Sequence, residues 1–158
     1  MKNINTSKKR HNVSMILYHI VLVAKYRKSV FIGQVDELII NTCKEIEDKF
    51  EIIFHEIWSD ENHIHLLIQT VPKFSPQKLI QITKSITAKE IFKTYPEIKK
   101  RLWWWQFRTD WYYINTVWWY WTVELIEKYI QNQWSNKTYK KMYRTQKTEN
   151  LFWDWIYT

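Results

Sequence analysis

Residues 50–70, FEIIFHEIWSDENHIHLLIQT, contain two apolar runs separated by a polar cluster. The first run, residues 50–58, and the second, residues 63–70, are rich in the β-branched and aromatic side chains that favour strands. Between them, residues 59–62 (SDEN) are polar throughout, as is typical of a turn. The sequence therefore predicts an antiparallel hairpin at the centre of a sheet.

Further elements are predicted on both sides of this hairpin. Residues 15–24 (MILYHIVLVA) predict a buried strand, and apolar residues at helical spacing predict a helix over residues 35–50. Ser75 is a suitable N-cap with Pro76 in the first helical position, so a second helix is expected over residues 77–93.

The remaining elements complete a recognisable order. Residues 112–117 (YYINTV) predict a fourth strand, and a last helix is expected over residues 123–134. This order predicts an α+β fold of the ferredoxin-like (split βαβ) type, an antiparallel sheet with helices on one face and an extra C-terminal helix. We expect a single domain over residues 1–158, with a mobile basic lead at 1–13 and a tail at 135–158.

The charge balance points to a polyanionic partner. Lys and Arg total 24 against 16 for Asp and Glu, a formal charge of +8, and such an excess favours nucleic acid or an acidic surface. No apolar run approaches the roughly 20 residues that a membrane span needs, and the polar N-terminus lacks the apolar segment of a signal peptide. We therefore expect a cytoplasmic protein without a membrane partner, in agreement with the lone Cys43.

Two pairs of residues carry candidate chemistry. His63 and His65 are two apart on a predicted strand, so both imidazoles share one face and can bind one divalent metal if a third ligand comes from elsewhere. Tyr129 and Gln133 are four apart on the last predicted helix, and also share a face. Taken singly, each pair is better explained by a structural role.

Together, five segments resemble a known family. They are YHIVLVAKYRKSV, ENHIHLLI, FSPQKLIQITKSITAKEIF, TDWYYINTV and VELIEKYIQNQ, which occur in this order between Tyr18 and Gln133. Order and spacing resemble the TnpA-type transposases of the smallest insertion sequences, members of the HUH endonuclease superfamily with a single tyrosine. The resemblance covers most of the chain and is far more specific than the His-x-His pair alone.

The resemblance implies a role for each matching residue. His63 and His65 correspond to the metal-binding histidines, Tyr129 to the nucleophile, and Gln133 to the third metal ligand. The implied cofactor is Mg²⁺ or Mn²⁺. Histidine ligands suit Mn²⁺ better than Mg²⁺, which prefers oxygen. The implied partners are a second copy of the chain, as a homodimer in which the tyrosine helix of one subunit can complete the histidine site of the other, and single-stranded DNA with a hairpin at the end of the element.

Several basic residues are candidates for contacts with DNA phosphates. For each of them a solvated charged surface is the alternative reading. They are Lys25, Arg27, Lys28, Lys84 and Lys89.

Two other functions compete with the transposase. A ferredoxin-like sheet with basic and aromatic residues also resembles an RNA-recognition motif, a nonenzymatic nucleic-acid-binding module, but that module needs aromatic side chains on its central strands. A domesticated relative that processes genomic repeats without moving an element would have the same sequence features, and only the flanking DNA separates the two.

The chain has 11 Trp and one Gly, whereas ordinary chains contain roughly 7% Gly. Members of the resembled family commonly have Gly where this chain has Trp104, Trp105, Trp111 and Trp118. We expect turns or helix ends at Trp58, Trp119, Trp121 and Trp134. We hypothesise that up to eight Trp are glycines encoded by UGA, which some bacteria read as Gly and a common alternative table reads as Trp. The alternative is genuine Trp gathered for stacking on single-stranded DNA. The eight positions are Trp58, Trp104, Trp105, Trp111, Trp118, Trp119, Trp121 and Trp134.

Overall fold

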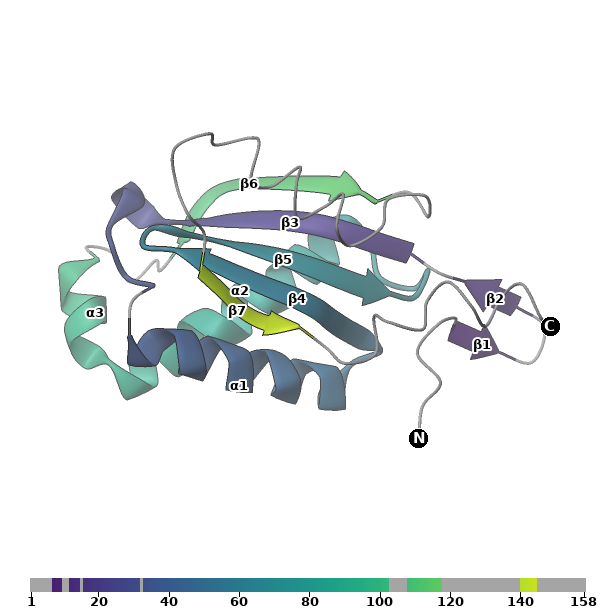
Figure 1. The fold of residues 1–158 in the computed structure, drawn as a ribbon, viewed down its shortest axis with the longest axis horizontal. Coiled ribbons are helices and arrows are strands. Elements are labelled where there is room, and N and C mark those ends of the chain that lie inside the picture. The colour runs from purple at the N-terminus through teal and green to yellow at the C-terminus, as the bar shows by residue number, and fades with distance from the viewer. Residues whose placement is uncertain are drawn as a thin grey trace.

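The fold is centred on one antiparallel sheet of five strands in the order β6-β3-β5-β4-β7, seen from top to bottom in Figure 1. The structure is a computed structural model, and it describes residues 7–9, 12–14, 16–31, 33–102, 108–117 and 140–144. The strands of the sheet are β3 (Ile16–Ala24), β4 (Ile52–Asp60), β5 (His63–Thr70), β6 (Arg108–Thr116) and β7 (Lys140–Arg144). The helices are α1 (Gln34–Lys49), α2 (Pro76–Thr94), α3 (Pro96–Arg101) and the short 3-10 helix η1 (Lys25–Arg27).

The ferredoxin-like prediction is confirmed. The four predicted strands are β3, β4, β5 and β6, and they lie in the spatial order fourth, first, third, second, with α1 and α2 connecting them as expected. The predicted C-terminal helix, residues 123–134, lies outside the described residues.

The predicted hairpin is β4 and β5, and its turn is tighter than expected. Asp60 pairs with His63, so Ser59 and Asp60 belong to β4, and only Glu61 and Asn62 remain in the turn. Farther from the turn, a β-bulge at His55, between Phe54 and Glu56, shifts the register of β4 with β5. Beyond the turn, β5 pairs with β3 over its full length, from Val23 opposite His63 to Ile16 opposite Thr70.

The two faces of β3 and β5 differ in character. Even-numbered residues form the hydrophobic core with the buried sides of α1 and α2, because alternate residues of a strand point to the same face. Odd-numbered residues point to the opposite face. The core residues of these two strands are Ile20, Leu22, Ala24, Ile64, Leu66 and Ile68.

Local signals explain where the helices begin. The Ser75 hydroxyl accepts a hydrogen bond from the Lys78 backbone N–H at 3.2 Å, and Pro76 is the first residue of α2, as predicted. The chain's one glycine, Gly33, precedes α1 with φ of +63°, a conformation that side chains with a Cβ rarely adopt.

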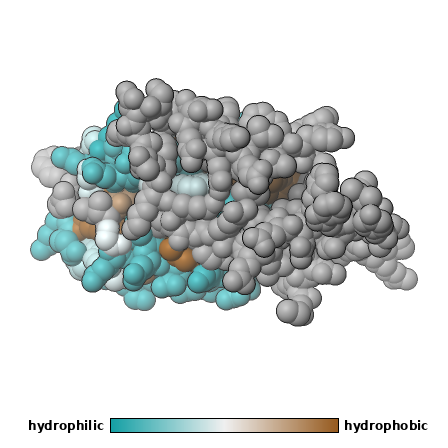
Figure 2. All heavy atoms as spheres, in the orientation of Figure 1, coloured by the Kyte–Doolittle hydropathy of each residue, from teal (hydrophilic) through white to brown (hydrophobic). Residues whose placement is uncertain are grey.

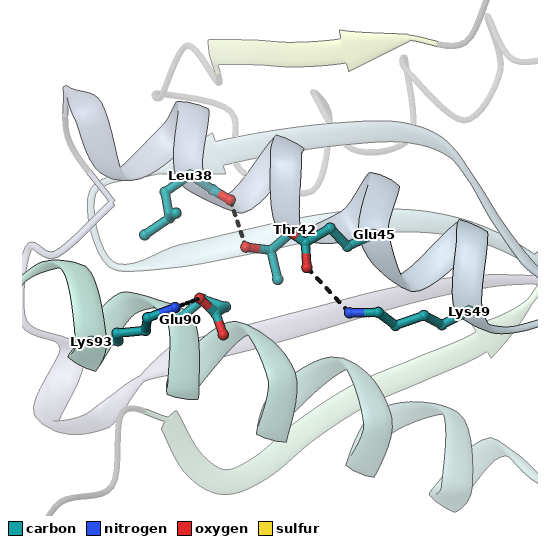
Figure 3. A network of polar contacts seen from close by, with 6 residues as sticks. All are labelled: Leu38, Thr42, Glu45, Lys49, Glu90 and Lys93. Carbon is teal, nitrogen blue, oxygen red and sulfur yellow. Dashed lines mark hydrogen bonds and ion pairs between the residues drawn. The ribbon is translucent and has the colours of Figure 1, made fainter.

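Polar contacts on α1 and α2 are mostly local (Figure 3). The Thr42 hydroxyl donates to the Leu38 carbonyl at 2.7 Å, and Lys49 pairs with Glu45 at 3.3 Å. Such exposed ion pairs contribute little to stability, so the helices are held chiefly by their apolar sides against the sheet.

Four elements, β1, β2, α3 and β7, were not predicted. Strand β7 extends the sheet beyond β4, and α3 follows α2 after Tyr95. In the segment for which we expected a basic lead, β1 (Ser7–Lys9) pairs with β2 (Asn12–Ser14) in a separate small hairpin.

The surface over α1 and α3 is mostly hydrophilic, interrupted by a few hydrophobic side chains (Figure 2). None of the helices in the described part of the chain has the length and apolar character needed to cross a membrane.

Two of the eight unusual tryptophans are described, and neither lies at a turn, which corrects our expectation for Trp58. Trp58 is an interior residue of β4, 5% exposed, and packs with Leu67. Trp111 is an interior residue of β6 and is 60% exposed. The described residues other than glycine with positive φ are Tyr26 and Arg27, so neither Trp occupies a backbone conformation that calls for glycine. The other six lie outside the described residues.

Candidate metal centre

His63 and His65 lie side by side on the face of β5 that α1 and α2 do not cover. Their ring centroids are 5.2 Å apart and the ring planes are inclined by 59°. On one side of β5, the register places His63 opposite Val23 and His65 opposite Val21 of β3. On the other side, Asp60 of β4 pairs with His63, and Trp58 pairs with His65. The strand periodicity thus brings the two imidazoles together as the sequence predicted.

The ring of His63 is held by the turn that precedes it. Its Nδ1 lies 2.7 Å from Oδ1 of Asn62, and since an amide oxygen only accepts, Nδ1 carries the proton and donates. Oδ2 of Asp60 lies farther from the same nitrogen, at 3.8 Å. The backbone carbonyl of Asn62 accepts from the Ala24 N–H at 2.8 Å, so the end of β3 fixes the residue that orients His63.

The ring of His65 is in contact with a third histidine, His19 of β3. Nδ1 of His65 and Nε2 of His19 are 2.9 Å apart, and the two residues are 1% and 2% exposed. The ring of Tyr113 on β6 approaches His19 edge-on with 6.1 Å between centroids.

Burial keeps these imidazoles neutral. Desolvation lowers the pKa of His19 to about 4, and desolvation, followed by the charges of His19 and His63, lowers the pKa of His65 well below its usual value of 6.5. A neutral imidazole is the form that binds a metal, so His65 is in its ligating protonation state at neutral pH.

The donor set fits a divalent metal with ligands still to be added. Metal-binding histidines typically engage their second ring nitrogen in a hydrogen bond. Both His63 and His65 engage Nδ1 in this way, so Nε2 of each ring would be the coordinating atom if a metal binds. Within the residues that the structure describes, no group of three or more His, Cys, Asp or Glu side chains is arranged to hold a metal. The predicted partners, Tyr129 and Gln133, lie outside the described residues.

Sequence reasoning missed His19 and Asn62. The signal for His19 was its odd position on the first strand, which shares a face with His63 and His65 once β3 and β5 are paired. That inference needed the register, which neither strand reveals alone. Asn62 had been grouped with the turn, and its side chain acquires a role only because the turn is tight.

The basic candidates for phosphate contacts lie on two elements. Lys25 and Arg27 are in η1, with Lys28 directly after it, and Lys84 and Lys89 are on α2. Lys84 lies over the ring of Tyr112 at 5.3 Å from its centroid and donates to the Asp110 carbonyl at 3.3 Å. Tyr26, Trp111 and Tyr112 are the large apolar side chains exposed in the described part of the chain, and they lie on or beside the same elements.

The central strands do not have the side chains of an RNA-recognition motif. On the face opposite the helices, β3 and β5 carry histidines, aliphatic residues and Gln69, and no Phe, Tyr or Trp within these two fully described strands. That module stacks bases on aromatic residues of its central strands. The arrangement therefore favours the metal site over the binding module.

Comparisons with known proteins agree on one family. Residues 12–133 match the family described as "Transposase IS200 like". The ISDra2 transposase TnpA of Deinococcus radiodurans is 30% identical over 128 residues, which are 80% of this chain and 89% of that protein. The transposase for insertion sequence element IS200 of Salmonella typhimurium is 24% identical over 100 residues, 63% of this chain and 66% of that protein.

The fold comparison is consistent with the sequence matches. A crystal structure of a transposase candidate from Deinococcus radiodurans R1 superimposes with a TM-score of 0.66 and 24% identity, covering 80% of this chain and 97% of the other. At this identity the similarity establishes the fold. Since the family match spans strands β3 to β6, the histidine pair and the segment containing Tyr129, we conclude that the chain belongs to the IS200-like transposase family and is a DNA transposase of an insertion sequence.

Proposed function

We propose that this transposase cuts and rejoins single-stranded DNA at the ends of its insertion sequence through a 5′-phosphotyrosine intermediate on Tyr129. His63, His65 and Gln133 would hold one Mg²⁺ or Mn²⁺. The active form would be a homodimer that recognises a DNA hairpin. The observation that carries the proposal is the pair of adjacent imidazoles whose Nδ1 atoms are both engaged in hydrogen bonds, in a chain of this family.

The covalent step follows from the chemistry of a phosphodiester. The phenol oxygen of Tyr129 attacks the scissile phosphorus, a new P–O bond forms to tyrosine, and the bond to the 3′ oxygen breaks. The phenol proton is lost to solvent or a base, and the departing oxygen takes up a proton as a 3′-OH. Because the phosphotyrosine keeps a phosphodiester linkage, a later 3′-OH reverses the step without ATP.

The metal, when bound, supplies Lewis-acid polarisation of the scissile phosphate. The chain's own part is to present two imidazoles in fixed orientation, with His65 kept neutral by burial. Asn62 holds His63, and burial on the sheet holds His65. Positioned donors of this kind favour the transition state, because little reorganisation is needed as charge develops.

The proposal leaves one close alternative within the same chemistry. A domesticated relative would cut repeats through the same residues without moving an element. The DNA on either side of the gene distinguishes the two, since a mobile element is bounded by the hairpin ends that the enzyme cuts.

The decisive experiment is cleavage of single-stranded oligonucleotides that span the element's ends, with Mg²⁺ or Mn²⁺, analysed on a denaturing gel. We expect a protein–DNA adduct that forms only with metal and is absent in Tyr129→Phe. The matched control is Tyr139→Phe, a nearby tyrosine to which we assign no role. Tight DNA binding with no adduct in any condition would refute the proposal and favour a binding module.

The same assay tests the glycine hypothesis. The chain should be made as written and with Gly at the eight positions, Trp58 and Trp111 being reverted separately as well. An adduct formed only by the glycine form would support mistranslation of UGA. UGG codons at Trp104, Trp111 and Trp118 in the coding DNA would exclude it.

A further inference from the structure

We infer that His19 is a positioning residue for the metal centre: it fixes His65 as the tautomer with its proton on Nδ1 and so directs Nε2 of His65 to the metal. This inference rests on the proposed function, since it concerns the same site. It is carried by the contact between two buried rings on neighbouring strands.

The ring geometry is that of an in-plane hydrogen bond. The planes are inclined by only 11° with centroids 5.1 Å apart, while Nδ1 of His65 and Nε2 of His19 are 2.9 Å apart. Rings stacked face to face keep their atoms roughly 3.5 Å or more apart, so these two rings lie edge to edge in nearly one plane. Ring N–H bonds lie in the ring plane, and the contact therefore aligns a donor with a lone pair.

One of the two nitrogens must carry the proton. If His65 coordinates through Nε2, that nitrogen presents its lone pair and the proton resides on Nδ1, which donates to Nε2 of His19. His19 then carries its own proton on Nδ1. In the opposite arrangement, Nε2 of His65 would bear a proton and would not ligate a metal without a tautomer change.

The sheet keeps this contact in place. Val21 is the residue of β3 opposite His65, and His19, two residues earlier, is its diagonal neighbour on the same face. Pairing of β3 with β5 on one side and β6 on the other fixes its backbone on both edges. His19 is therefore held rigidly against His65, as His63 is held by Asn62.

The first measurement needs neither metal nor DNA. In metal-free protein labelled with ¹⁵N at histidine, the ring-nitrogen shifts report the tautomer of His65, assigned by comparison with His65→Gln. We expect the proton on Nδ1 in the wild type. A proton on Nε2 would overturn the inference, whatever the protein does to DNA.

The second measurement compares two substitutions at position 19. Leu removes the acceptor but keeps an apolar volume in the buried site, whereas the side-chain carbonyl of Gln can replace Nε2 as the acceptor. We expect His19→Leu to change the His65 ring shifts and to weaken Mn²⁺ binding about 10- to 100-fold, and His19→Gln to restore both. Mn²⁺ binding is measured by the electron paramagnetic resonance signal of the free ion.

A matched control separates positioning from loss of a buried polar group. Gln69→Leu removes the side chain whose Oε1 lies 2.8 Å from Nε2 of His55 on the same sheet, and we expect it to leave His65 shifts and Mn²⁺ binding unchanged. Equal Mn²⁺ affinity in wild type and folded His19→Leu would overturn the inference. Failure of the wild type to bind Mn²⁺, with the expected His65 tautomer, would instead overturn the proposed metal function.

Discussion

Two of the three histidines at the centre are nearly inaccessible, and this has a thermodynamic consequence. An imidazole that must stay neutral in the folded state, but ionises freely in the unfolded chain, makes folding dependent on pH. The pKa of His19 is lowered to about 4 and that of His65 is lowered as well, both by burial first. The unfolded state therefore binds more protons than the folded state once the pH falls below the ordinary value of 6.5.

We predict that the metal-free protein loses stability as the pH falls from 6.5 towards 4. The contribution of His19 approaches about 1.4 kcal/mol per pH unit within this window and vanishes above it. Urea unfolding at pH 7, 6 and 5 in the presence of a chelator measures the slope. His19→Gln, which does not titrate, should show a shallower slope, and equal slopes in both proteins would contradict the prediction.

Trp58 and Trp111 provide a second test at single residues. Trp58 is 5% exposed and packs on Leu67, so Trp58→Gly should lower the unfolding free energy by about 3–5 kcal/mol through the cavity it leaves. Trp111 is 60% exposed, and Trp111→Gly should cost roughly 1 kcal/mol or less, chiefly from glycine's backbone freedom. Unfolding in urea measures both, and a neutral or stabilising Trp58→Gly would favour glycine as the encoded residue.

At the scale of the elements, the N-terminal cap of α2 can be tested by single substitutions at Ser75. Ser75→Ala removes the acceptor for the Lys78 N–H and should cost about 1 kcal/mol in the free energy of unfolding. Ser75→Asp retains a capping oxygen and should remain near the wild type. If alanine and aspartate had equal effects, the hydroxyl would have no capping role and Pro76 alone would set the start of the helix.

The elements also show how far the sequence predicts this fold. Periodicity and turn chemistry were enough for β3, β4, β5, α1 and α2, because each has a strong local pattern. Strand β7 could not be predicted, since its five residues, KKMYR, become a strand only by pairing with β4. For the site, spacing placed His63 with His65, but the His19 contact depends on register between strands far apart in sequence.

At the scale of the whole molecule, the described residues include two of the three proposed metal ligands, His63 and His65, and leave the third to another part of the chain or to a second copy. The resemblance implies that the tyrosine helix of one subunit can complete the histidine site of the other. This arrangement predicts complementation between two inactive proteins, one lacking the nucleophile and the other lacking a histidine.

Tyr129→Phe and His65→Ala should each be inactive in adduct formation. After mixing and subunit exchange, half of the dimers are mixed and each has one intact composite site, so about a quarter of the wild-type sites should form adducts. Denaturing gels with labelled oligonucleotide measure the recovered fraction. Recovery of adduct formation in the mixture would show that the site is shared between subunits. A mixture as inactive as its two components would show that each subunit uses its own tyrosine.

Because residues along β5 alternate between the two faces of the sheet, substitutions at even and odd positions should have different effects in cells. Even positions, such as Ile64 and Leu66, lie in the core between sheet and helices, whereas His63 and His65 at odd positions face the opposite side. In a library of all single substitutions, changes at even positions should deplete the protein from cells, whereas those at the half-buried His63 should spare abundance and abolish mobility of the element. Lineages of a decaying element would then lose His63 first, and leave a folded protein that no longer cuts.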